Sequence, residues 1–110
     1  MITVALYRNA GGAIYGFKAD DHGESLVCAA VSTLSINAVN SVETFTDLEF
    51  TCDFYEEGGF LSFELPAIKA GAENRDAHVL LESLRLGLKA LENDYFDEIR
   101  VIEEVQQCSE

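Results

Sequence analysis

Residues 25–42 read SLVCAAVSTLSINAVNSV, and here the hydrophobic pattern changes from that of strands to that of a helix. The apolar residues of this segment recur every three or four positions, at Val27, Val31, Leu34, Ala38 and Val42. Such spacing places them on one face of a helix. We predict a helix that follows an N-cap at Ser25 and ends between Asn40 and Glu43.

Two pairs of strands flank this helix in the chain. Before it, residues 1–7 and 13–19 are rich in strand-forming residues, and the Asn and two Gly within 8–12 are typical of a hairpin turn. After it, residues 44–54 and 59–65 predict a second antiparallel pair. Each pair is therefore expected to lie in one sheet.

The strongest helical pattern in the chain spans Asp76–Glu92. One apolar stripe runs along it, formed by Ala77, Leu80, Leu81, Leu84, Leu88 and Leu91. A loop at 67–74 precedes this helix, and a last strand at 98–105 follows it. The predicted fold is α+β and two-layered, with two helices on a five-strand mixed sheet in the order strand-strand-helix-strand-strand-helix-strand. We predict one domain over 1–105 and a frayed tail at 106–110.

The charge balance limits the classes of partner. The chain of 110 residues has 20 Asp and Glu against 7 Lys and Arg, a formal net charge of -13. So acidic a surface repels phosphate backbones and anionic lipids, which argues against nucleic-acid and membrane-surface binding. No apolar run approaches about 18 residues, so no membrane-spanning helix is expected. A basic protein or a basic peptide is the partner that this charge favours.

The three cysteines, Cys28, Cys52 and Cys108, are odd in number and widely spaced, which does not indicate a disulfide framework or a zinc site. Cys52 is expected to be packed in its strand, and Cys108 lies in the tail. The apolar residues 1–7 lack the basic region of an export signal, so we read them as a strand. The chain is accordingly expected in the cytoplasm, without a metal or another cofactor.

One cysteine lies where a helix can activate it. If Ser25 caps the helix, Cys28 is its third residue, where unpaired amide hydrogens and the positive end of the helix dipole favour a thiolate. His22 lies on the incoming loop and can act as its base, and Ser32 lies one turn beyond Cys28. The alternative is structural: Cys28 stands in an apolar run as a small core residue, and His22 is a solvated loop residue.

Two stretches, Gly16–His22 and Gly23–Ser32, resemble the motifs of the Prp family, the ribosomal-processing cysteine proteases. The specific part is Val-Cys-Ala-Ala-Val-Ser at 27–32. The resemblance implies a cytoplasmic homodimer that removes an N-terminal extension from a large-subunit ribosomal protein, cutting after an aromatic residue. Carried over by position, it implies Cys28 as nucleophile and His22 as base.

The resemblance also assigns supporting positions and departs from the family pattern. Ser32 would supply a supporting hydroxyl, and Ser25 stands where the family has Asp. Asp21 and Gly23 flank His22 in place of Gly and Ala, and the segment between His22 and the cysteine has about half its usual length. We expect either an active protease or a degenerate relative that binds a basic ribosomal peptide without cutting it.

A rival alignment bears on the second possibility. It sets the Gly-Phe pair at 16–17 against the family's Gly-His pair, so that Phe17 replaces the catalytic histidine. His22 is the preferred match, because the same Gly-Phe pair then stands at the family spacing before it. The two alignments predict opposite activities.

Overall fold

The computed structural model describes residues 1–20, 26–55 and 60–106. Along the chain the elements are β1 (Ile2–Arg8), β2 (Ile14–Asp20), α1 (Leu26–Phe45), β3 (Thr51–Tyr55), β4 (Phe60–Glu64), α2 (Pro66–Lys69), α3 (Arg75–Asp94) and β5 (Ile99–Val105). The predicted order is confirmed. Within the described residues the structure adds α2, a single turn where the loop was predicted, which Pro66 begins because proline suits the first position of a helix.

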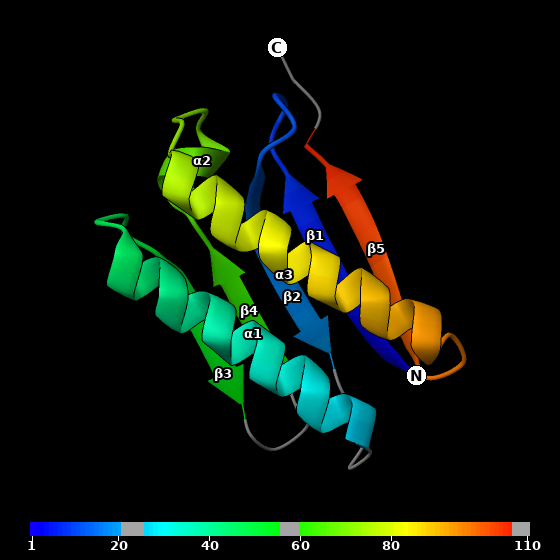
Figure 1. Ribbon diagram of the computed structural model, residues 1–110. Helices are drawn as coiled ribbons and strands as arrows, with labels where there is room; N and C mark the ends of the chain where they lie inside the picture. Colours follow the sequence, from blue (N-terminus) through cyan, green and yellow to red (C-terminus); the bar gives the residue numbers. More distant parts are fainter. Residues whose placement is uncertain (21–25, 56–59, 107–110) are drawn as a thin grey trace.

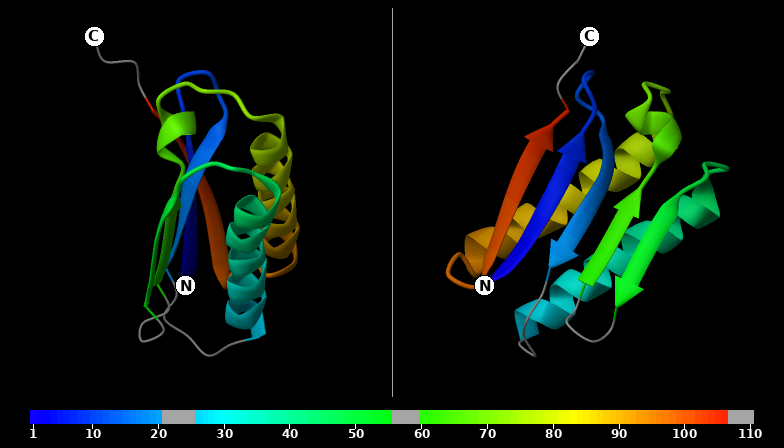
Figure 2. Two further views of the ribbon diagram at one scale, coloured as in Figure 1. Left: turned by 90° about the vertical axis from the view of Figure 1, so that its left-hand side faces the viewer. Right: turned by 180° about the vertical axis from the view of Figure 1, so that it is seen from behind.

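The strands form one mixed sheet in the order β3-β4-β2-β1-β5 (Figure 1). All pairs are antiparallel except β1 with β5, which are parallel. The two long helices lie side by side on one face of the sheet, as the edge-on view in Figure 2 shows. The predicted two-layer α+β fold is therefore confirmed.

The core lies between the sheet and the two long helices. The stripe predicted for α3 is buried at Ala77, Leu81, Leu84 and Leu88, and β4 buries Leu61 and Phe63 on alternate positions. Phe63 also packs against Phe17 and Phe50, with ring centroids 5.5 and 5.4 Å away. The apolar faces that the helical and strand patterns predicted thus pack against one another in one core.

Helix α1 extends further than its sequence indicated. We expected it to end by Glu43 and a strand to begin at residue 44, whereas the helix continues to Phe45 and β3 begins at Thr51. The main-chain N–H and the hydroxyl of Thr46 both donate to the carbonyl of Val42, at 3.1 and 2.7 Å. These bonds complete the last turn, so the weak strand preference of 44–46 does not decide the local structure.

The same helix contradicts one exclusion made from the sequence. By length and composition α1 is apolar enough to cross a membrane. A core helix of a small domain passes the same test, and α1 turns Val27, Val31, Ser35, Ala38 and Val42 into the interior of this one.

At the other end of the chain, Gln106 donates its N–H to the carbonyl of Arg8 at 2.7 Å, and residues 107–110 lie outside the described part.

Candidate active site

Cys28 is the third residue of α1, as the sequence predicted. Its side chain is half-buried and packs against the edge of the core. The first turn of α1 carries no acidic residue, so no carboxylate there offsets the positive end of the helix dipole. This end of α1 lies at the same end of the molecule as the last residues of β2 and β3 (Figures 1 and 2).

The predicted partners of Cys28 are placed only in part. His22 and Ser25, the expected base and N-cap, lie outside the described residues, as does Cys108. Ser32 is half-buried on α1, four residues after Cys28, so the two residues lie on the same side of the helix. The described structure therefore places Ser32 and Cys28 on the same side of α1.

Phe17, the alternative match for the catalytic histidine, belongs to the core. Its side chain is fully buried in β2 and packs against Phe63. Its paired neighbours are Leu6 on β1 and Phe63 on β4. Residue 17 thus has a structural role in this chain.

Cys52 is exposed rather than packed, which corrects the expectation from the sequence. It lies on β3, the outermost strand, and its strand neighbours Thr51, Asp53 and Phe54 are exposed too. Partial desolvation raises the pKa of the Cys52 thiol, and the nearby Asp53 carboxylate raises it further. The sequence pattern did not reveal this, because strand-forming residues look alike at the middle and at the edge of a sheet.

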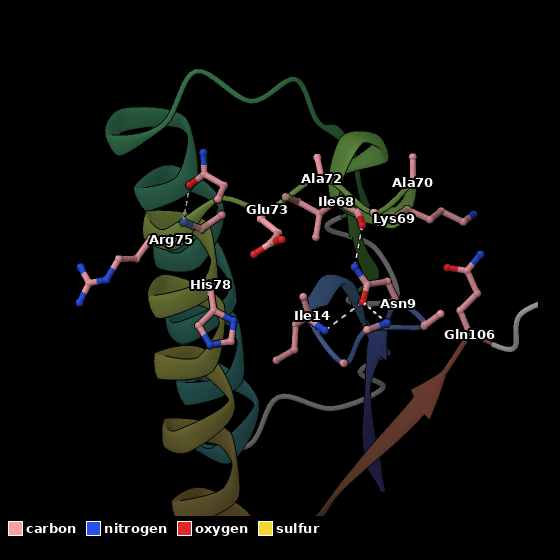
Figure 3. A pocket seen from close by; sticks show the side chains of 17 residues that line it. Asn9, Ile14, Ile68, Lys69, Ala70, Ala72, Glu73, Arg75, His78 and Gln106 are labelled. Atoms are coloured by element: carbon pink, nitrogen blue, oxygen red, sulfur yellow. Dashed lines mark hydrogen bonds between the residues drawn. The ribbon is translucent and has the colours of Figure 1, made fainter.

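A cavity of about 840 Å³ lies at the opposite end of the molecule from Cys28. The β1–β2 hairpin, α2 and the start of α3 line it, and the side chain of Asn9 is directed toward the main chain of Ile68 (Figure 3). His78 is exposed on α3. Over the described ranges, no group of three His, Cys, Asp or Glu residues is arranged to hold a metal ion.

Comparison with known proteins connects this fold and cysteine to one family. The family model described as "Cysteine protease Prp" matches residues 1–100. The ribosomal processing cysteine protease Prp of Bacillus subtilis is 34% identical over 107 residues, covering 92% of this chain and 96% of that protein.

Two solved structures have the same fold. The crystal structure of SMU.848 from Streptococcus mutans is 28% identical, with a TM-score of 0.82 and 96% of each chain covered. An essential ribosomal processing protease Prp from S. aureus, in complex with a substrate peptide, is 24% identical. Its TM-score is 0.83, and the match covers 94% of this chain and 100% of that one.

Proposed function

The chain belongs to the Prp family of cysteine proteases, and on this premise we propose that it removes an N-terminal extension from a large-subunit ribosomal protein. We assign Cys28 as the nucleophile and His22 as the base. The observation that carries this assignment is the position of Cys28 in the first turn of a 20-residue helix whose start has no acidic residue. A helix start of this kind stabilises a thiolate.

In the proposed reaction, His22 takes the proton of the Cys28 thiol, and the sulfur attacks the carbonyl carbon of the scissile peptide bond. Amide hydrogens at the start of α1 stabilise the negative oxygen of the tetrahedral intermediate. The imidazolium returns its proton to the leaving amine, which departs and leaves a thioester. Water then attacks the thioester, which releases the new carboxyl end and restores the thiol. Ser32 and Ser25 supply supporting hydroxyls.

The burial of Phe17 supports His22 over the alternative alignment. A fully enclosed ring between neighbouring strands explains an aromatic residue at 17 by packing alone, without reference to a lost catalytic group. His22, by contrast, belongs to the segment between β2 and α1, and α1 carries Cys28 within its first turn. Chain connectivity thus keeps His22 within six residues of the nucleophile.

We place the protein in the cytoplasm, as a homodimer that acts on a basic peptide and binds neither nucleic acid nor membrane. The net charge of -13 supports a basic substrate. β4 lies between β3 and β2, so residues 60–65 can contribute to a dimer contact through a face of the sheet and not through edge-to-edge pairing. A helix face is the other candidate for the contact, and the composition of α1 favours its outer side, because Glu43 is the only charged residue in that helix.

The test is incubation of the protein with the N-terminally extended ribosomal protein of the same organism, followed by mass spectrometry of the products. We expect the wild type to remove the extension, and Cys28→Ala and His22→Ala to leave it intact. Cys108→Ala is the matched control, because it also removes one thiol and no step of the proposed reaction uses that residue, so this variant should cut normally. Cleavage by Cys28→Ala would refute the assignment.

A second candidate is a relative that binds the ribosomal peptide and does not cut it. The shortened segment between His22 and Cys28 and the serine at 25 favour it. In that case the wild type binds the extended protein, cleaves none of it, and loses no affinity when Cys28 is changed to Ala. Circular dichroism of each variant establishes that loss of cleavage does not reflect loss of the fold.

A further inference from the structure

Strand β3 lies at one edge of the sheet, and the helices leave its inner face uncovered. Cys52 pairs with Phe63 and Phe54 pairs with Leu61, so these side chains lie on the same face as the buried core residues. Phe63 and Leu61 are 1% and 5% exposed, whereas Phe54 is 50% exposed and Cys52 is exposed as well. The inner face of β3, formed by Cys52 and Phe54, is therefore open to solvent beside the helical layer.

The main-chain groups of the same two residues point away from the sheet. Leu65 donates its N–H to the carbonyl of Tyr15 at 2.7 Å, in register with the pairing of β2 and β4. Alternate residues of a strand bond to opposite neighbours, so the even-numbered residues of β4 face β3. Their partners on β3 are residues 51, 53 and 55. Cys52 and Phe54 consequently direct their N–H and C=O groups to the open edge.

The other edge of the sheet is protected against strand addition. β5 carries Arg100, Glu103 and Glu104, and Glu103 is held by Arg8 and Arg85 at 2.8 and 3.0 Å. Charged residues on an edge strand are the usual means of preventing further pairing. β3 carries a single charge at Asp53, so of the two edges it is the one open to another strand.

The charge at this edge selects the occupant. Asp53 is exposed at the middle of β3, and Glu49 is exposed just before it. Two copies of the chain paired about the midpoint of β3 would place Asp53 against Asp53, which is destabilising. A basic segment meets no such repulsion. β3 also ends at the end of the molecule where α1 begins, and α1 carries Cys28 there (Figure 1).

We propose that β3 is the strand on which the substrate docks. An extended basic segment, next to the bond that is cut, adds to the sheet by hydrogen bonding to the main chain of Cys52 and Phe54. On the inner face of β3, the ring of Phe54 contacts an apolar side chain of that segment. The identity of the segment rests on the function proposed above, whereas the docking edge follows from the fold.

The test measures peptide affinity on the Cys28→Ala protein, which does not consume the probe. The probe is a fluorescein-labelled peptide of alternating lysine and threonine with one central phenylalanine, read by fluorescence anisotropy. A series carries one N-methyl group at successive main-chain nitrogens. In strand addition only alternate N–H groups face the protein, so we expect affinity to fall about two- to tenfold at every second position and to hold at the others.

Variants of the protein give the second measurement. Phe54→Ala should weaken binding about three- to tenfold, through loss of the aromatic contact. Phe96→Ala is the matched control, because that ring is 77% exposed in the turn between α3 and β5 and should not matter. A uniform response to N-methylation, with equal effects of the two alanine variants, would overturn the proposal.

Parallel assays separate this inference from the proposed function. If the wild type processes the ribosomal protein but N-methylation shows no alternation, the docking edge is wrong and the protease assignment stands. If the alternation appears and no cleavage occurs, β3 binds peptide and the protease assignment fails. If Phe54→Ala changes the sedimentation of the protein and leaves peptide affinity intact, β3 is a contact between copies and the proposal is refuted.

Discussion

Replacing Asn9 with alanine should destabilise the fold more than any other change to an Asn side chain in the described part of the chain. Asn9 is 6% exposed and lies at the turn between β1 and β2. Its amide donates to the carbonyl of Ile68 at 2.8 Å, and its side-chain oxygen accepts from the N–H groups of Gly11 and Ala13 at 2.9 and 3.0 Å. One side chain thus shapes the hairpin and joins it to α2 (Figure 3).

The expected magnitude follows from these three bonds. Each contributes about 1 kcal/mol net, and the alanine variant removes all three, while the Ile68 carbonyl keeps its hydrogen bond from the N–H of Gly71 at 3.0 Å. We therefore expect Asn9→Ala to lower the free energy of unfolding by roughly 3 kcal/mol. For a domain of this size that loss corresponds to a Tm lower by roughly 10–15 °C.

Urea denaturation followed by circular dichroism measures this difference, and thermal melting checks it. Asn37→Ala is the control, because Asn37 is exposed on α1 and its change should alter stability by less than about 0.5 kcal/mol. If Asn9→Ala and Asn37→Ala unfold at the same urea concentration, the hydrogen bonds of Asn9 do not hold the hairpin to α2, and the reasoning fails.

Three further outcomes are expected. Iodoacetamide near neutral pH should modify Cys28 before the more exposed Cys52, whose raised pKa leaves less thiolate; peptide mapping that finds the reverse order would contradict an activated Cys28. Gly16→Ala should cost at least about 2 kcal/mol in a urea titration, because its methyl group would lie 2.4 Å from a main-chain oxygen of the β4 strand, and wild-type stability would show that the sheet can yield there. The hydrogen bond from Arg8 lowers the pKa of Glu103 in the folded protein. The Glu103 carboxylate therefore stabilises the fold fully above its unfolded pKa of about 4.3, and this stabilisation is lost as the pH falls through its lower, folded pKa. Glu103→Gln should thus cost under about 1 kcal/mol at neutral pH and nothing in acid, and a cost independent of pH would point to packing instead.

Local sequence patterns were sufficient for most of the elements. The four-residue spacing in α1 and α3 and the alternation in β4 describe which face of each element is apolar, and a face must be buried wherever the element lies. The position of Cys28 in the first turn also followed locally, since it depends only on where the apolar helical stripe begins. Such features need no knowledge of distant residues.

Other features depend on contacts between distant segments, and only the tertiary structure decided them. The parallel pairing of β1 with β5 joins the two ends of the chain, and no local pattern specifies it. Cys52 looked like a packed strand residue, yet it is exposed, because β3 is the outermost strand of the sheet. The burial of Phe17 and the outward direction of the main-chain groups of Phe54 also depend on which strands pair in the sheet. Burial belongs to the position of a strand within the sheet, which pairing with distant strands determines.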